Sequence, residues 1–266
     1  MSTEILFGTK EWAPHNFNFM NGCSNDCVYC YAKEMAIRFK RKTQSNWKIE
    51  EPVSLDGKTF KKKNGTIMLP SSHDITPGNI DIALSVIEKL LSSGNELLIV
   101  TKPHFKCIKL IVDKFADKKS QIQFRFTIGS ANSAVLKSWE PGATDFPERL
   151  KSLRLAFENG FSTSISCEPL LDDQFDILYD KVKDYVTGSI WIGKMNFPSR
   201  RVRTNTKDKA FDVQVKILIE SQSDNKIIKL WKQYNENPLI EWKESIKKVA
   251  IQYGLINHDE KIREFA

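Results

Sequence analysis

The part of the sequence best suited to chemistry is a short segment that contains three cysteines. Cys23, Cys27 and Cys30 stand in the spacing Cys-x3-Cys-x2-Cys. Three thiolates on one loop can each bind one iron of a [4Fe-4S] cluster, and the fourth iron is then left without a local protein ligand. An iron with an open coordination position can bind and activate a second molecule. The segment therefore predicts an iron–sulfur centre that takes part in a reaction.

A structural zinc site is the alternative interpretation of these cysteines. Such sites usually close four positions, commonly with paired Cys-x2-Cys arrangements. The other two of the five cysteines, Cys107 and Cys167, form no second pair of this kind. His15, His73 or one of these cysteines would have to supply the fourth ligand. The rival to an enzyme is thus a zinc-stabilised module that binds nucleic acid.

The elements that must position the cysteines alternate between short apolar runs and amphipathic segments. Expected strands are 17–20, 66–70, 96–101, 121–129, 161–169 and 189–194, and expected helices are 31–42, 80–91, 105–115, 146–158 and 175–185. One helix between successive strands indicates parallel pairing with right-handed crossovers. About six such units are fewer than a closed barrel needs, so the predicted α/β fold is a partial (β/α)6 TIM-type barrel. A doubly wound sheet ranks second, because no Gly-x-Gly-x-x-Gly fingerprint follows these strands.

The predicted domain organisation has two parts. Residues 1–195 form the barrel, with a basic insertion at 43–65 after the first helix, and residues 196–266 form a helical extension packed on the barrel. Helical patterns in the extension cover 211–219, 226–234 and 240–253. The basic segments 58–63 and 200–203 suit phosphate contacts, and Trp47 and Phe60 near the first segment suit stacking on bases.

Charge and hydropathy narrow the choice of partners. The chain of 266 residues has a net charge of +7, which favours an anionic partner such as DNA or RNA. No apolar run approaches the roughly 18 residues of a membrane-spanning helix, and the first residues lack the pattern of a signal peptide. We therefore expect a cytoplasmic protein with no membrane partner.

The cysteine spacing, with Tyr29 before the last cysteine, is similar to the signature of the radical S-adenosylmethionine (SAM) superfamily. Within it, the chain resembles the spore photoproduct lyase branch through motifs that follow in order: Ser71-Ser72-His73-Asp74, Val100-Thr101-Lys102, Phe124-Arg125-Phe126-Thr127-Ile128 and Glu140-Pro141-Gly142. The resemblance implies a partial barrel with a [4Fe-4S] cluster whose fourth iron is chelated by the methionine part of SAM. Reductive cleavage of SAM would then give a 5′-deoxyadenosyl radical that abstracts hydrogen from the substrate.

The resemblance also implies roles for residues around the cofactor. Tyr29 would contact the adenine ring, and Lys102 would pair with the methionine carboxylate. Ser72 or His73 would accept a hydrogen bond from the methionine amino group, and the sequence does not choose between them. Thr127 would reach the ribose hydroxyls, although a β-branched residue is also ordinary in a strand.

One departure from the lyase pattern concerns the hydrogen donor. The lyase returns hydrogen through a cysteine after its second strand, and the corresponding stretch here, 70–74, contains none. Cys167, at the end of the fifth expected strand, is either a replacement donor at the barrel mouth or a buried, inert thiol.

Further polar residues have two interpretations each. Arg125 faces either the barrel lumen or solvent, because it alternates with Phe124 and Phe126. The side chains at or just past strand ends either line the pocket or belong to the surface; they are Glu140, Glu168, Lys194 and Asn196.

The predicted function is radical SAM chemistry on a nucleic-acid base or base lesion, in repair or modification similar to that of spore photoproduct lyase. A base would have to be exposed or flipped to reach the barrel mouth. Modification of a peptide or small metabolite is the alternative within enzymes. The expected partners are DNA or RNA and an electron donor such as flavodoxin or ferredoxin.

Overall fold

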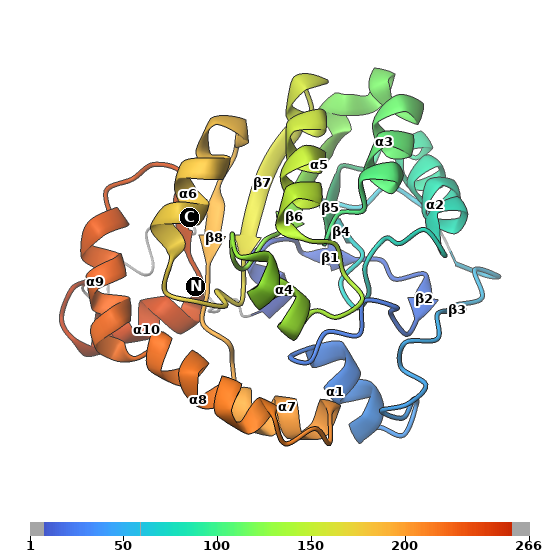
Figure 1. Ribbon diagram of the computed structural model, residues 1–266. Coiled ribbons are helices and arrows are strands. Elements are labelled where there is room, and N and C mark those ends of the chain that lie inside the picture. Colours follow the sequence, from blue (N-terminus) through green and yellow to red (C-terminus); the bar gives the residue numbers. More distant parts are fainter. Residues whose placement is uncertain (1–7, 59, 257–266) are drawn as a thin grey trace, which may run out of the picture.

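The main element of the fold is a parallel sheet of seven strands. The computed structural model describes residues 8–58 and 60–256. The strands lie in the order β1 (His15–Asn16), β4 (Ile67–Leu69), β5 (Leu97–Thr101), β6 (Ile122–Thr127), β7 (Ser162–Cys167), β8 (Ile190–Ile192) and β9 (Ile240–Trp242). Every neighbouring pair in this sheet is parallel. Their carboxyl ends therefore meet at one end of the molecule, where barrel active sites form (Figure 1).

Helices cover the outer face of the sheet and its carboxyl end. They are α1 (Tyr31–Arg38), α2 (Ile80–Ser92), α3 (Phe105–Lys114), α4 (Ser133–Trp139), α5 (Phe146–Glu158), α6 (Phe175–Val182), α7 (Pro198–Asn205), α8 (Phe211–Ser221), α9 (Asp224–Tyr234) and α10 (Glu244–Gln252), with 3-10 turns η1 (Gly8–Glu11), η2 (Ala116–Gln121) and η3 (Lys183–Tyr185). Figure 1 shows α2, α3, α5 and α6 along the sheet and α1, α7 and α8 side by side beyond the strand ends. No described helix is both long enough and apolar enough to cross a bilayer.

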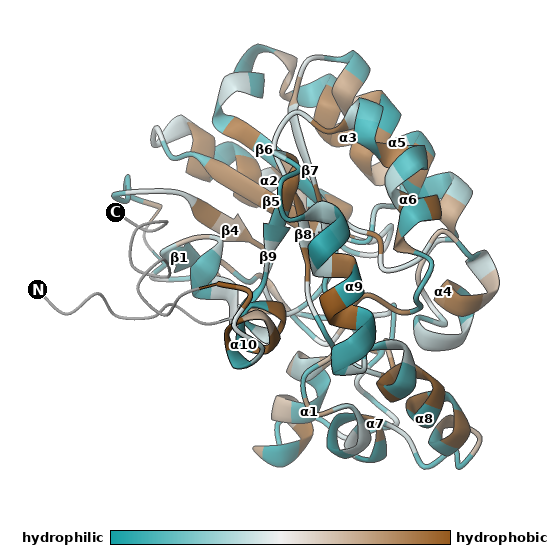
Figure 2. Ribbon diagram, turned by 90° about the vertical axis from the view of Figure 1, so that its left-hand side faces the viewer, coloured by the Kyte–Doolittle hydropathy of each residue, from teal (hydrophilic) through white to brown (hydrophobic). Residues whose placement is uncertain are grey.

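Burial explains why these segments form strands and helices. All five residues of β5 are buried, as expected for a central parallel strand covered on both faces. The first turn of α5 is stabilised by Asp145, whose carboxylate accepts a hydrogen bond from the Glu148 backbone at 3.0 Å. Figure 2 shows the hydrophobic strands and helix faces meeting inside the molecule, with hydrophilic faces outward.

The predicted α/β partial barrel is confirmed, and its edges differ from the prediction. The first strand lies at His15–Asn16 rather than 17–20, because Met20–Asn21 (β2) pairs antiparallel with Glu51–Pro52 (β3) of the insertion. A seventh strand, β9, occupies the start of the predicted helix 240–253, and α10 begins only at Glu244. The sheet thus crosses the predicted domain boundary at residue 195, and the division into two domains stays a prediction.

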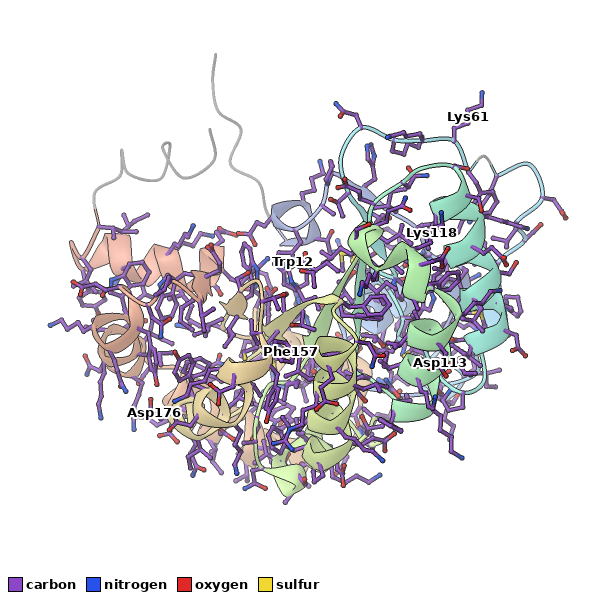
Figure 3. All side chains as sticks on the ribbon, turned by 90° about the horizontal axis from the view of Figure 1, so that it is seen from above. Trp12, Lys61, Asp113, Lys118, Phe157 and Asp176 are labelled. Carbon is purple, nitrogen blue, oxygen red and sulfur yellow. The ribbon has the colours of Figure 1, made fainter. Side chains whose placement is uncertain are left out.

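The N-terminal segment fills the barrel interior. Trp12 packs against a small cluster formed by Ala13 and three strand residues, Met68, Leu98 and Val100. Figure 3 shows Trp12 near the middle of the molecule, next to the strands and between the C-terminal helices and the α2–α3 side. Tryptophan supplies the large apolar surface that an open barrel of seven strands needs in its interior.

Candidate active-site cavity

A cavity of about 550 Å³ opens at the carboxyl ends of the strands. Residues that the sequence analysis singled out line it together: Cys23, Cys27, Tyr29, Cys30, Ser72, His73, Lys102, Thr127, Glu168, Lys194 and Asn196. They come from the cysteine loop and from the segments after β4, β5, β6, β7 and β8. Its size lies within the range of small-molecule sites, about 300–1,000 Å³.

The cysteine loop is held by backbone contacts to the segment after α4. The Val28 N–H donates to the Trp139 carbonyl at 2.9 Å, and the Gly142 N–H donates to the Asn25 carbonyl at 3.0 Å. A Cβ atom at Gly142 would lie 2.1 Å from the Ser24 carbonyl oxygen, so this close approach requires glycine. The Glu140-Pro141-Gly142 motif thus supports the loop from behind.

Helix α7 holds the other side of the same loop. The Asn205 side-chain amide is buried and donates to the Val28 carbonyl at 2.9 Å and to the Cys30 carbonyl at 2.8 Å. Arg200 and Arg201 of α7 pair with Glu34 of α1 at 2.9 and 3.3 Å. A residue far along the chain therefore fixes the backbone on both sides of Tyr29.

The three thiols of the cysteine loop all line the cavity. Among the described residues, no three histidine, cysteine or acidic side chains converge on one ion position. Thiolates that bind separate irons do not need to meet at one point. Burial raises the pKa of all three thiols, and mutual repulsion adds to the rise for Cys23. A bound cation would favour their charged forms.

Unpaired polar atoms in the cavity point to a polar ligand. The Ser166 hydroxyl and both ring nitrogens of His73 are buried, and no hydrogen-bond partner is seen for them among the described residues. Leaving such a group unpaired costs about 1–3 kcal/mol, which a bound polar molecule recovers. Burial lowers the pKa of His73 to about 4, so its ring is neutral near pH 7 and can accept a hydrogen bond. The cavity therefore fits a cofactor with several polar groups.

Asp74 holds Lys102 beside the cysteines. The Lys102 ammonium lies 3.5 Å from the Asp74 carboxylate, which also accepts hydrogen bonds from the Lys102 backbone at 2.8 Å and from Asn25 at 2.9 Å. Cys23 Sγ lies 3.8 Å from the same carboxylate. Although burial opposes both charges, their attraction and these hydrogen bonds lower the pKa of Asp74 and raise that of Lys102. Both side chains are therefore ionised inside the cavity.

Tyr29 is fixed by a second buried pair. Its hydroxyl donates to Glu140, whose carboxylate pairs with Arg149 at 2.5 Å, and both charged side chains are fully buried. Arg149 also donates to the Thr127 carbonyl at 3.1 Å. We call Tyr29, Asp74, Lys102, Glu140 and Arg149 the cysteine-side cluster. It ties the loop to β5 and β6.

A different set of charges closes the opposite side of the barrel. Lys243, which follows β9, pairs with Glu11 of η1 and with Glu168 at 3.4 Å, and it donates to the Gly8 carbonyl at 2.9 Å. Its ammonium lies 4.5 Å from the Trp12 ring centroid. We call Glu11, Trp12, Glu168 and Lys243 the closing cluster, because it joins the N-terminal segment to the last strand.

Arg125 faces the barrel lumen, which decides between its two interpretations. Its guanidinium lies 4.9 Å from the Trp12 ring centroid and 5.2 Å from that of Trp191, and it donates to Ser164 at 2.7 Å. Burial lowers its pKa to about 9. Arg125 is not among the residues that line the cavity, and its guanidinium packs on the Trp12 ring.

Cys167 does not lie at the barrel mouth, where the sequence analysis considered it as a replacement hydrogen donor. Ser166 and Glu168 line the cavity, and Cys167 between them is fully buried in the hydrophobic core and is not among the lining residues. Neighbouring strand residues point to opposite faces, so Cys167 faces away from the cavity. Of the two interpretations, this placement favours the buried, inert thiol over the hydrogen donor. Glu140 likewise lies behind the cavity wall rather than in it.

The basic insertion lies apart from the cavity except for Trp47. Trp47 is buried next to Cys23 and lines the cavity, so it is not free to stack on bases from outside. Phe60 packs on Phe17 at 5.4 Å between ring centroids. The Lys63 N–H donates to Asn95 at 2.8 Å, just before β5, which places this part of the insertion at the amino ends of the strands. The structure thus places Trp47 in the cavity wall rather than on the outer surface of the insertion.

Sequence reasoning missed three cavity or wall residues. Asp74 stood in the Ser-His-Asp stretch, and a carboxylate directly after a buried strand was the signal that could have identified it. Ser166 shares the strand face of Ser164 and was detectable from the alternation. Lys243 carried no local signal, because it meets Glu11 only through the fold.

Comparison with known proteins identifies one matching family and two relatives by sequence. The model of the Radical SAM superfamily matches residues 17–189. An uncharacterised protein of Methanocaldococcus jannaschii is 27% identical over 169 residues, which is 63% of this chain and 64% of the relative. An uncharacterised protein of the Acidianus two-tailed virus is 26% identical over 60% of this chain and 56% of the relative. The chain thus spans less than two thirds of the length of either relative.

Solved structures with the same fold hold two kinds of bound molecule. A spore photoproduct lyase complexed with dinucleoside spore photoproduct has a TM-score of 0.53 and 18% identity, covering 77% of this chain and 64% of the lyase. Streptococcus suis SuiB bound to its precursor peptide SuiA has a TM-score of 0.52 and 13% identity, covering 92% of this chain and 51% of SuiB. At these identities the likeness concerns the fold.

Proposed function

Because the chain belongs to the radical SAM superfamily, we propose that it cleaves SAM reductively at a [4Fe-4S] cluster held by Cys23, Cys27 and Cys30. The protein is an enzyme of the radical SAM class, and the superfamily implies SAM and an iron–sulfur cluster as cofactors. When bound, the cluster and SAM supply a 5′-deoxyadenosyl radical that removes a hydrogen atom from the substrate. The observation that carries the proposal is one cavity shared by the three thiols, Lys102 and the unpaired atoms of His73 and Ser166.

The residues of the cavity have separate tasks in this proposal. Lys102, charged and held by Asp74, pairs with the methionine carboxylate. His73, neutral and without a partner, accepts a hydrogen bond from the methionine amino group, and Ser72 is the alternative acceptor. Tyr29, fixed by Glu140, contacts the adenine, and the hydroxyls of Thr127 and Ser166 meet the ribose. The barrel wall excludes water from the radical.

For the substrate, we propose a nucleic-acid base or base lesion. The support is the net charge of the chain, +7, and three basic side chains that line the cavity in addition to Lys102, namely Lys10, Lys194 and Arg201. Lys194 also pairs with Asp224, and Arg201 with Glu34. The fold likeness to a lyase with a bound dinucleoside agrees with this choice. The likeness to SuiB with a bound peptide keeps peptide modification as the second candidate.

The cofactor part of the proposal is tested by anaerobic reconstitution. We expect iron and sulfide in a brown protein that forms 5′-deoxyadenosine from SAM with a chemical reductant. Cys27→Ala should lose the cluster and this activity. Cys107→Ala is the matched control, because Cys107 is buried in α3 away from the cavity. A colourless protein that holds zinc on all of its cysteine ligands would overturn the proposal in favour of the zinc-stabilised module.

The substrate part is tested by isotope transfer. Oligonucleotides and peptides carrying deuterium on carbon are supplied separately, and deuterium is measured in the 5′-deoxyadenosine formed. Transfer from an oligonucleotide supports the nucleic-acid proposal, and transfer only from a peptide replaces it with the second candidate.

A further inference from the structure

The cysteine loop separates two hollows. Cys27 lines the cavity, whereas its neighbours Asp26 and Val28 line a groove of about 970 Å³ on the outside of the loop. The groove is bounded by α1 and the turn after it, by the end of α7 and by the start of α8. Figures 1 and 2 both show α1, α7 and α8 next to one another at this end of the molecule. A single layer of chain therefore stands between the thiols and the outer groove.

The groove is basic. Its charged lining residues are Lys33, Lys40, Lys42 and Lys207 against one acidic residue, Asp26. Lys33 pairs with Asp26 at 2.6 Å and Lys42 with Glu51 at 2.8 Å. Lys40 and Lys207 are exposed, and in the described part of the chain neither has an ion-pair partner. These two positive charges are thus available to a partner.

Exposed apolar side chains occur directly after α1 and on α8, two of the helices that bound the groove. Phe39 precedes Lys40 in the chain and is 58% exposed, and Val213 and Ile217 of α8 are 62% and 63% exposed. Exposed apolar residues among basic ones are typical of a protein-binding surface rather than of a solvated face.

We propose that this groove binds a small acidic electron-transfer protein of the flavodoxin or ferredoxin kind. The inference rests on the proposed function, because the cluster needs an electron for each SAM cleavage. One electron passes from the reduced carrier, which is oxidised by one electron, to the cluster, which is reduced by one, and no bond or proton moves in this step. Basic charge on the groove steers an acidic partner and increases its association rate.

The geometry favours an electron donor over nucleic acid at this surface. A base must enter the cavity to meet a radical, and a strand bound in the groove would have the cysteine loop between it and the cavity. An electron carrier needs only a short path to the cluster. The cysteine loop offers a fixed path, because Val28, the residue bonded to Cys27, is held by two hydrogen bonds. Its carbonyl accepts from the Asn205 side chain, and its N–H donates to the Trp139 carbonyl. A donor in the groove also leaves the substrate entrance open.

The test compares two electron sources in one protein. The double variant Lys40→Glu/Lys207→Glu is reconstituted, and 5′-deoxyadenosine formation is measured with reduced flavodoxin below saturation and with dithionite. We expect the flavodoxin-driven rate to fall about tenfold or more and the dithionite-driven rate to stay within about twofold of wild type. Higher salt should shrink the difference between variant and wild type, because it screens the steering charges.

A matched control has the same change of net charge at the other end of the barrel. Lys118 on η2 and Lys181 on α6 are exposed and lie near the amino ends of the following strands; Figure 3 labels Lys118. Lys118→Glu/Lys181→Glu should leave both rates unchanged.

The proposal is overturned if the groove and control variants have equal flavodoxin-driven rates, or if the groove variant loses the dithionite-driven rate as well. It is also overturned if the groove variant binds an oligonucleotide more weakly but keeps its flavodoxin-driven rate, since the groove then contacts nucleic acid. If the proposed function itself is wrong, the wild type will not cleave SAM with dithionite, and this result differs from each outcome above.

Discussion

Two clusters of buried charge stand on opposite sides of the cavity, and they differ in where their residues lie in the chain. The cysteine-side cluster is built entirely from residues within 17–189, the part that matches the superfamily model. The closing cluster joins Glu11 and Lys243, which both lie outside that part, to Glu168 inside it. The cysteine-side cluster thus lies wholly in the part that matches the superfamily model, whereas the closing cluster depends on segments outside that part.

The clusters also differ in how completely their charges are removed from water. The Glu140 and Arg149 side chains are 0% exposed, whereas Glu168 in the closing cluster keeps 23% of its side chain exposed. A charge with no access to water depends wholly on its partner, and one near water can be rehydrated. Breaking the Glu140–Arg149 pair should therefore cost more stability than breaking the Lys243–Glu168 pair.

The largest effect is expected for Arg149→Met. The substitution leaves Glu140 buried without its partner, and we expect the free energy of unfolding to fall by about 3–5 kcal/mol. Because Glu140 also fixes Tyr29, cluster content should fall as well. Urea denaturation and iron per chain are the measurements. Arg154→Met on the same helix is the control, since Arg154 is exposed and stacks on Tyr185. An equal loss of stability in Arg154→Met and Arg149→Met would contradict the special cost of the buried pair.

A smaller effect is expected for Lys243→Met. Glu168 can be rehydrated, whereas Glu11, with 5% of its side chain exposed, loses its partner, so we expect a loss of about 3 kcal/mol in the free energy of unfolding, the lower end for a broken buried pair. Iron content and SAM cleavage without substrate should stay at the wild-type level, because the closing cluster does not touch the cysteine loop. Lys248→Met, at an exposed position of α10, should cost less than about 1 kcal/mol. Loss of iron in Lys243→Met would show that both clusters serve the cofactor.

The smallest expected effect is on the pH dependence of stability, and it comes from His73, which lines the cavity. Burial lowers the pKa of His73 to about 4 from its usual 6.5. Between these values the unfolded chain binds a proton that the folded chain does not, so folding becomes less favourable as pH falls through this window. From pH 7 to pH 5 the cost is about 2 kcal/mol. His73→Phe, which can still pack on Phe19, should lack this part of the pH dependence in urea denaturation of the metal-free protein. An unchanged slope would mean that His73 is solvated.

The sequence predicted the parts of the fold and site in which local pattern and chemistry coincide. The strands β4 to β8 and the cysteine loop carry their own signals, namely apolar runs, helix spacing and thiol spacing. For Cys167 the sequence left two interpretations open, because its position at a strand end suggests the barrel mouth whereas the alternation along the strand turns it toward the core. β9 was missed because three residues directly before a helix merge with the helical pattern.

The features that the sequence did not predict depend on contacts between distant segments. The sequence around Trp12 carries no pattern that predicts its place in the barrel interior, because its partners Arg125 and Lys243 lie far away in the chain. The same holds for Lys40 and Lys207, which become neighbours of one groove only after α1 and α7 pack together. Such contacts follow from the topology and cannot be found by inspecting one segment at a time.

The amide of Asn205 has a consequence for the order of biosynthesis. Asn205 and the Val28 carbonyl that it binds are 177 residues apart. While a ribosome is still producing the barrel, the thiol-bearing loop lacks this support, and only release of α7 completes it. We expect iron delivery to a nascent chain to be inefficient until α7 has docked, which makes cofactor loading a late event in maturation.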